Sequence, residues 1–180
     1  MYKRQVVLLV LLFSQQLIAA EASRIYLVRH AEKVDQSSES LLTELGSARA
    51  ERLAELLADE PLTHIFSTPY NRTLLTARPT ADSQGIAISE YDGGQLQAFA
   101  DELLKLEGQI LVVGHSNTTP VLVNHLVGTE FPFLEDNIYD RVYVVSISAK
   151  GEASLQMQYT EPRTGSEGVP YDPRMLDRPR

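Results

Sequence analysis

Apolar and polar residues follow one another along this chain in two patterns, short apolar runs and longer stretches in which apolar residues recur with helical spacing. The short runs predict strands, and the periodic stretches predict helices. The segments that we expect to be strands are 24–28, 65–66, 86–91, 109–113, 141–148 and 152–159. The segments that we expect to be helices are 43–59, 69–79, 96–106 and 117–127. Alternating strands and helices indicate an α/β fold, here closed by a hairpin of the last two strands.

Local features mark the ends of several of these elements. Thr43 is expected to cap the first helix, although Gly46 stands where a reciprocal capping box would have Glu or Gln. Pro79 is expected to bend or stop the second helix, and Gly128 to end the fourth. The strand at 109–113 is apolar without alternation, so we expect it to be central in the sheet and covered on both faces.

The first 22 residues have the three-part layout of a secretory signal peptide. Lys3 and Arg4 precede an apolar run over 6–13, and small residues follow at Ala20 and Ala22. Cleavage after Ala22 fits the Ala-x-Ala pattern, and cleavage after Ala20 is also tolerable. The alternative is a retained N-terminal anchor, for which the run is short. We therefore expect a periplasmic or secreted protein without a stable membrane span after the leader is cleaved.

Composition limits what the rest of the chain can be. Without residues 1–22, 158 residues remain, enough for one domain over 23–160 that buries roughly 70% of its unfolded surface. The segment 161–180 is rich in proline and glycine, so we expect a loop or a disordered tail. The absence of cysteine excludes disulfides, thiol nucleophiles and thiolate metal sites. The net charge of −8 argues against nucleic acid or an anionic membrane as a partner.

Basic side chains stand where two of the predicted strands end. Arg29 and His30 follow the strand at 24–28, His115 follows the strand at 109–113, and Arg72 lies between them in the chain. The carboxyl ends of parallel strands meet at the crevice where α/β sheets bind ligands. Guanidinium groups match phosphate oxygens in geometry and charge, and a neutral imidazole is a nucleophile near pH 7. The sequence therefore predicts phosphate chemistry at this edge.

The motifs around these residues resemble those of the histidine phosphatase superfamily, the phosphoglycerate-mutase-like proteins. The motifs are Leu27-Val28-Arg29-His30, Leu42-Thr43-x-x-Gly46, Ser67-Thr68 followed by Arg72 and Thr76-Ala77, and Val113-Gly114-His115-Ser116-Asn117. The chain is most similar to the small capless branch that includes the bacterial phosphohistidine phosphatases. This resemblance implies a single three-layer domain, with a mixed, mostly parallel sheet of about six strands and helices on both faces.

The resemblance also implies roles for individual residues. His30 would attack phosphorus and form a phosphohistidine that water later hydrolyses. Arg29 and Arg72 would bind the phosphoryl oxygens and neutralise their charge in the transition state, and His115 would hydrogen-bond the transferring group. Ala31 replaces the glycine of the family's Arg-His-Gly motif, which restricts the backbone after the nucleophile to negative φ.

Other site residues keep two interpretations each. Asp92 is the candidate general acid, with Glu90 second, yet both suit ordinary turn or strand-edge positions. Asn117 is expected to cap the fourth helix, to touch phosphate, or both. Glu32 and Lys33 follow the nucleophile and either line the mouth of the site, where they would bind substrate, or pair at the surface.

Two further histidines and the question of a metal complete the candidates. His64 and His125 are expected to be packed or rim histidines rather than members of the site. We expect no metal and no cofactor, because the chain has no His-x-x-x-His spacing or carboxylate cluster and the arginines already supply positive charge.

The favoured hypothesis is an exported, metal-independent phosphatase that hydrolyses phosphomonoesters, with a small phosphorylated substrate or free phosphate as its ligand. The alternatives are a phosphohistidine-protein phosphatase and a non-catalytic phosphate-binding module. A mutase is disfavoured, because one predicted helix takes up the connection between Asp92 and the strand at 109–113 and leaves no insertion for a lid. Rim residues such as Phe131 and Tyr139 are expected to contribute to specificity. The sequence predicts neither the physiological substrate nor the oligomeric state.

Overall fold

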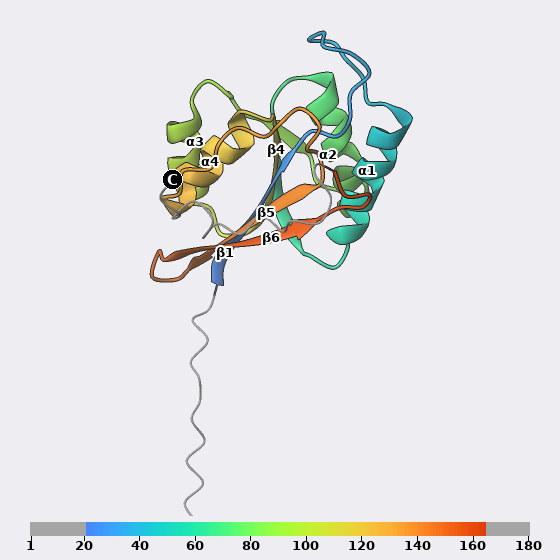
Figure 1. Cartoon of the computed structure of the whole chain (residues 1–180). Coiled ribbons are helices and arrows are strands. Elements are labelled where there is room, and N and C mark those ends of the chain that lie inside the picture. The colour runs from blue at the N-terminus through green and yellow to red at the C-terminus, as the bar shows by residue number, and fades with distance from the viewer. Residues whose placement is uncertain (1–20, 165–180) are drawn as a thin grey trace, which may run out of the picture.

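The computed structural model describes residues 21–164, which form one six-stranded mixed sheet between two layers of helices (Figure 1). The order of the strands across the sheet is β3-β2-β4-β1-β5-β6. The strands are β1 (Glu21–Arg29), β2 (Leu62–Ser67), β3 (Ile88–Glu90), β4 (Gly108–Gly114), β5 (Arg141–Ser148) and β6 (Ala153–Tyr159). The four strands from β3 to β1 are parallel, and β5 and β6 are antiparallel additions. The expected fold class is confirmed.

Helices cover both faces of the sheet in pairs. They are α1 (Glu44–Leu56), α2 (Asn71–Gln84), α3 (Leu96–Leu103) and α4 (Thr118–Val127). Figure 1 shows α1 and α2 on one side of the sheet and α3 and α4 on the other. Alternate residues of β1 supply the two cores, because Ile25 packs in the cluster of α3 and α4 and Tyr26 in that of α1 and α2. The amphipathic patterns are thus satisfied on both faces.

The two central strands end side by side. In the parallel pair of β1 and β4, Arg29 lies opposite Gly114. The pairing continues one step further, because the backbone N–H of His30 donates to the carbonyl oxygen of Gly114 over 2.8 Å. The residues that follow these strands, His30 and His115, therefore begin at the same edge of the sheet, as the sequence predicts.

The first turn of α1 shows why residue 46 is glycine and not the Glu or Gln of a capping box. Thr43 is the N-cap, and its hydroxyl accepts a hydrogen bond from the N–H of Gly46 over 3.0 Å. A Cβ at Gly46 would overlap with the backbone carbonyl of Glu32. Glycine is therefore needed here for the close approach of α1 to the segment that follows His30.

Other predicted boundaries are wrong in detail. The second helix does not stop at Pro79 but continues to Gln84, where Gly85 ends it in a left-handed conformation with φ 68°. Thr80 and Ala81, directly after the proline, are buried against the sheet, and this packing outweighs the hydrogen bond that proline cannot donate. The first helix ends at Leu56 rather than near residue 59.

Some expectations concern residues that the structure does not describe. Residues 1–20 of the expected leader and residues 165–180 of the expected tail lie outside the described part of the chain. Over residues 21–164, no helix has both the length and the apolar character needed to cross a bilayer. Between β3 and β4 the chain forms only the eight-residue α3.

Candidate active site

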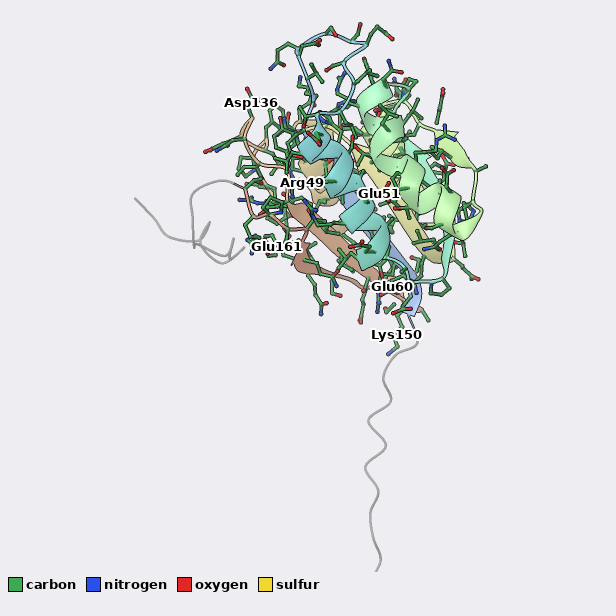
Figure 2. All side chains as sticks on the ribbon, turned by 90° about the vertical axis from the view of Figure 1, so that its right-hand side faces the viewer. Arg49, Glu51, Glu60, Asp136, Lys150 and Glu161 are labelled. Atoms are coloured by element: carbon green, nitrogen blue, oxygen red, sulfur yellow. The ribbon has the colours of Figure 1, made fainter. Side chains whose placement is uncertain are left out.

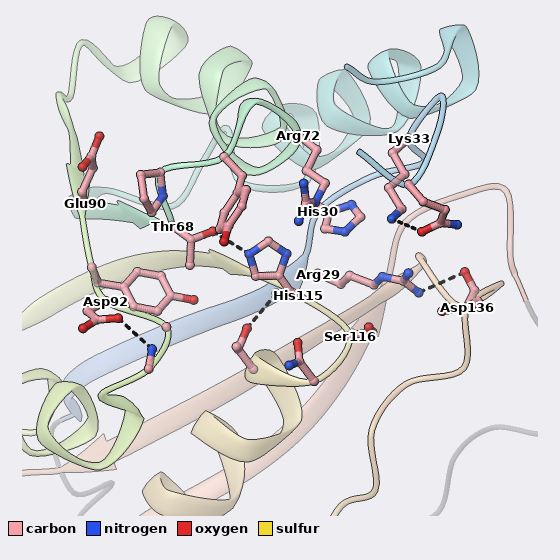
Figure 3. Close-up of a pocket in the computed structure, with 18 residues that line it drawn as sticks. Arg29, His30, Lys33, Thr68, Arg72, Glu90, Asp92, His115, Ser116 and Asp136 are labelled. Atoms are coloured by element: carbon pink, nitrogen blue, oxygen red, sulfur yellow. Dashed lines mark hydrogen bonds between the residues drawn. The ribbon is translucent and has the colours of Figure 1, made fainter. Parts of the chain in front are cut away.

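A pocket of about 760 Å³ opens at the carboxyl ends of the parallel strands (Figure 3). Arg29, His30, Arg72 and His115 all line it, and the ring centroids of the two histidines are 5.5 Å apart. The predicted convergence of these four side chains is therefore confirmed. We call this group the basic wall of the pocket. Their chemical roles stay predictions.

His30 has one ring nitrogen occupied and one open. Its Nδ1 lies 2.8 Å from the carbonyl oxygen of Ala31. A carbonyl only accepts hydrogen bonds, so Nδ1 carries the proton and Nε2 keeps its lone pair. The pKa of His30 is lowered to about 3, mainly by burial and also by the nearby charge of Arg29, while the bond to Ala31 acts in the opposite direction. The imidazole is therefore neutral at pH 7, which a nucleophile requires.

The alanine after His30 is compatible with this geometry. Among the described residues, no residue other than glycine has a positive φ, so Ala31 is not strained. Its side chain is fully buried, and its N–H donates to the hydroxyl of Thr76 over 2.9 Å. The replacement of glycine by alanine is accommodated here by ordinary backbone geometry.

Arg29 is held rigidly at the base of the wall. It is only 4% exposed, and its Nη1 donates to the carbonyl oxygens of Glu135, Asp136 and Ile138 over 2.9, 3.1 and 2.9 Å. The guanidinium carbon also lies 4.1 Å from the centre of the Tyr139 ring. Within the described chain, its Nε is buried without a hydrogen-bond partner. All of its recorded side-chain hydrogen bonds use Nη1, so Nη2 is the donor that an anion in the pocket would accept from.

Arg72 enters the pocket from the first turn of α2. Its Nη1 donates to the backbone carbonyl of Ser38 over 3.1 Å, and its guanidinium carbon lies 4.5 Å from the centre of the Tyr70 ring. Its Nε, like that of Arg29, is buried and unpartnered among the residues described. Lys33 lines the same side of the pocket, and its pKa is lowered by burial first and then by Arg72 and Arg29. Positive charge is thus concentrated here.

His115 is oriented by a chain of hydroxyl groups. Its Nε2 lies 2.9 Å from the hydroxyl of Thr68, which donates to the hydroxyl of Thr73 over 3.0 Å. Thr73 donates in turn to backbone carbonyls, so Thr68 accepts from His115 and we assign the proton to Nε2. Burial lowers the pKa of His115 to about 4, with Arg72 and Arg29 adding to the effect. A bound phosphate dianion would raise this pKa again and favour the doubly protonated ring.

Two carboxylates lie at the opposite end of the pocket. Glu90 and Asp92 both line it, and we call this part its acidic end (Figure 3). Both side chains are exposed, and Asp92 accepts a hydrogen bond from the N–H of Gly94 over 2.8 Å. Asp92 therefore makes the turn contact that the sequence suggested and also faces the site. The geometry is compatible with either residue as the general acid.

The remaining predicted site residues divide into two groups. Lys33 and Asn117 line the pocket, and for Asn117 no side-chain capping bond is found in the described chain. Thr118 supplies the local hydrogen bond instead, since its hydroxyl accepts from the N–H of His115 over 2.8 Å. Glu32 does not line the pocket, because Arg49 binds both of its carboxylate oxygens at 2.7 to 3.0 Å.

One prediction for the rim of the pocket is wrong, and the other two histidines lie where the sequence predicts. Phe131 is buried in the core against Tyr143 and is no rim residue. Tyr139 contacts the site through Arg29, as described above. His64 stacks on Phe66, with 5° between the ring planes, and His125 is exposed on α4. Both histidines lie outside the pocket, as expected.

Sequence reasoning overlooked several residues that line the pocket. Thr68 belongs to the Ser67-Thr68 motif, so its place directly after β2 was a signal that could have identified it. Ser116 also lines the pocket, and its place beside His115 in a quoted motif was a similar signal. Tyr70 and Asp136 line the pocket as well, and no local pattern singles them out. In residues 21–164, no three His, Asp or Glu side chains form a group that could hold a metal ion.

Comparison with known proteins agrees with this geometry. The model of the histidine phosphatase superfamily (branch 1) matches residues 25–93, which contain Arg29, His30 and Arg72. Over these residues the chain is similar to the histidine phosphatase superfamily. A probable phosphoglycerate mutase, GpmB, of Yersinia pestis (strain Pestoides F) is 35% identical over 72 residues. That match covers 36% of this chain and only 34% of the relative, so the chain spans about a third of the length of that protein.

Solved structures share the fold over most of their length. The protein histidine phosphatase SixA complexed with tungstate superposes with a TM-score of 0.62 at 19% identity, over 76% of this chain and 96% of that one. Phosphoserine phosphatase from Entamoeba histolytica, in complex with 3-phosphoglyceric acid, superposes with a TM-score of 0.59 at 16% identity. This match covers 77% of this chain and 97% of that one. At these identities the likeness establishes the fold alone.

Proposed function

We propose that this protein is a member of the histidine phosphatase superfamily and a phosphatase that hydrolyses phosphomonoesters through a phosphohistidine on His30. One observation carries the proposal. The open Nε2 of a neutral His30 shares its pocket with the guanidinium groups of Arg29 and Arg72, whose recorded hydrogen bonds within the described residues all go through Nη1. A phosphoryl group that accepts from both arginines would lie against a nucleophile that needs no deprotonation.

The reaction would proceed in two displacements. First, the lone pair of His30 Nε2 forms a bond to phosphorus, the ester P–O bond breaks, and the leaving oxygen takes a proton from Asp92 or Glu90. Second, water forms a P–O bond as the N–P bond breaks, and the carboxylate recovers the proton from this water. The products are the alcohol, inorganic phosphate and the original imidazole. Arg29, Arg72 and a protonated His115 would stabilise the charge on the phosphoryl oxygens in both steps.

The proposal includes independence from metal ions and export from the cytoplasm. The two arginines supply the positive charge that a metal ion would otherwise provide, so we expect turnover to persist in the presence of a chelator. Export is supported by the layout of residues 1–22. The mass of the N-terminus of the full chain recovered from the periplasm or medium of an expressing bacterium tests this part. A protein that keeps Met1 would contradict it.

A labelling experiment tests the chemistry. The purified full chain, given a generic aryl phosphate in EDTA, should release inorganic phosphate and accumulate an acid-labile, base-stable phosphoenzyme on His30. His30→Ala should lose about four orders of magnitude in turnover or more, because the nucleophile itself is removed. It should still bind inorganic phosphate, since both arginines remain. The proposal fails if His30→Ala still turns over the aryl phosphate.

A phosphohistidine-protein phosphatase is the second candidate, and the exposure of the acidic end favours it. An imidazole leaves more readily than an alkoxide, so such an enzyme needs no dedicated acid. Only the short α3 stands between β3 and β4, which leaves the pocket open to a phosphorylated protein side chain. Comparison of kcat/KM for an alkyl phosphate and for a phosphohistidine-bearing protein separates the two candidates. The same openness disfavours a mutase, which must keep water from its phosphoenzyme.

A further inference from the structure

A short segment near the end of the described chain passes along one side of the site. Residues 160–164, which we call the C-terminal strap, follow β6 and lie beside α1, where Figure 2 labels Arg49 and Glu161. Arg49 is only 3% exposed, and it donates to the hydroxyl of Thr160 over 2.9 Å and to the carbonyl of Pro162 over 2.9 Å. The same guanidinium holds Glu32, two residues after the nucleophile. The strap is therefore tied to the residues behind the pocket, although Glu161, Pro162 and Arg163 are exposed.

The end of the strap binds the segment that carries Arg29. The hydroxyl of Thr164 accepts hydrogen bonds from the N–H groups of Tyr139 and Asp140, over 2.8 and 3.1 Å. In the reverse direction, the carboxylate of Asp140 accepts from the N–H of Thr164 over 3.1 Å and from Arg163 over 2.7 Å. Asp140 is 1% exposed, so these bonds are shielded from water.

Every recorded hydrogen-bond or ring partner of the Arg29 side chain within the described residues lies in the segment to which Thr164 is bonded. The three carbonyls that bind its Nη1 and the ring that faces its guanidinium all come from residues 135–139. This segment precedes β5 and has no strand or helix of its own in the described fold. A displacement of Tyr139 would therefore also displace the guanidinium group of Arg29.

We propose that Thr164 is a positioning residue for phosphoryl transfer, which holds Tyr139 against Arg29 and so sets the direction of the Arg29 donors. The inference rests on the proposed function for its kinetic consequence. Thr164 does not touch the substrate. It acts through two backbone N–H groups and an aromatic ring, and a misplacement of Arg29 by a fraction of an ångström would weaken its bond to the transition state more than its bond to the substrate.

A matched set of variants tests this role. Thr164→Val keeps the shape of the side chain and removes the acceptor, and Thr164→Ser restores the hydroxyl. Ser148→Ala is the control, because Ser148 also accepts from two backbone N–H groups, those of Lys150 and Glu152, but in the turn after β5 at the far end of the sheet. Each full-length variant is measured for kcat and KM on an aryl phosphate, for binding of inorganic phosphate by calorimetry, and for thermal unfolding.

The expected result separates positioning from stability. Thr164→Val should lose about tenfold or more in kcat/KM, mostly in kcat, and bind inorganic phosphate more weakly. Thr164→Ser should stay within about twofold of the wild type, and Ser148→Ala should lower the unfolding temperature without changing the kinetics. Wild-type kinetics and phosphate binding in folded Thr164→Val would overturn the proposal. If the wild type hydrolyses nothing, the proposed function fails, and the phosphate affinities alone then decide whether Thr164 positions Arg29.

Discussion

The two ends of the pocket differ in how firmly their side chains are held. The basic wall consists of buried or half-buried groups, and their recorded side-chain hydrogen bonds go to backbone carbonyls or to the hydroxyl of Thr68. The acidic end consists of two exposed carboxylates, of which Asp92 is bonded to the turn that contains it. In the proposed reaction, the wall would bind the phosphoryl group, which is the same in every phosphomonoester, whereas the acidic end would contact the leaving group, which varies.

This difference indicates which groups are already in position before the proposed reaction begins. Fixed donors lower the barrier because they need no reorganisation as charge develops on the phosphoryl oxygens. A proton donor on an exposed turn can adjust to leaving groups of different shape, at the cost of weaker acid catalysis. The contrast predicts that changes in the basic wall affect all substrates alike and that changes at the acidic end depend on the leaving group.

Replacement of the arginines should give the largest effect. Arg29→Lys should lower kcat/KM by about two orders of magnitude or more for every substrate, because lysine cannot both bind the carbonyls of residues 135–138 and face the phosphate. Arg72→Lys should cost about tenfold less than that, since Arg72 is more exposed and holds fewer groups. Steady-state kinetics on one aryl and one alkyl phosphate measure both. Equal losses for the two variants would remove the distinction between them.

Neutralisation of a carboxylate at the acidic end should lower kcat on some substrates and not on others. Asp92→Asn is expected to lower kcat on an alkyl phosphate by about tenfold to a hundredfold and to leave an aryl phosphate nearly unchanged, because a phenolate leaves without help. Glu90→Gln is the matched variant at the same end. Whichever of the two shows the selective loss is the acid, and a loss that is equal on both substrates would show that the residue binds rather than protonates.

The free energy of unfolding of the ligand-free protein should depend on pH, because the two histidines are buried. The folded pKa values of about 3 for His30 and about 4 for His115 lie below the unfolded value near 6.5. Between these values the unfolded chain binds more protons, so the free energy of unfolding falls as the pH drops from about 6.5 toward 4. His30 should contribute up to about 2 kcal/mol of this loss between pH 7 and 5, and the more exposed His115 less because water screens it.

Urea unfolding at pH 7 and pH 5 measures this contribution. The loss of stability on acidification should be smaller in His30→Ala than in the wild type, since the buried imidazole is gone. Saturating inorganic phosphate should also reduce it, because the bound anion favours protonated histidine. An unchanged difference between the two pH values in His30→Ala would show that His30 titrates normally in the folded protein.

Much of the fold could be predicted because its main determinants are local. The unbroken apolar run of β4 identifies a central strand, and Thr43 and Gly128 mark helix ends through their own backbone preferences. The basic wall could be predicted for a related reason, since Arg29, His30 and His115 lie where such strands end. Only Arg72 needed the resemblance to a family, because an arginine on a helix is usually a solvated one.

The residues that support the site could not be predicted, because their partners come from distant parts of the chain. Arg49 has the sequence context of a surface arginine on an amphipathic helix, and it is buried only because Glu32 and Thr160 reach it from either side. The contacts of Thr164 with Tyr139 have the same origin. The prediction at Pro79 is wrong for the opposite reason, since a local preference for a break is outweighed by the packing of Ala77 and Ala81 in the core.

The pairing of β1 with β4 has a consequence for how this site can change. Because backbone hydrogen bonds fix Arg29 opposite Gly114, the spacing of the two imidazoles follows from strand register and not from the side chains around them. One residue inserted within β4 would turn the side chains beyond it to the other face of the sheet and carry His115 away from His30. The lengths of β1 and β4 therefore cannot change without separating the two histidines, whereas residues on the surface around the pocket can change without moving them.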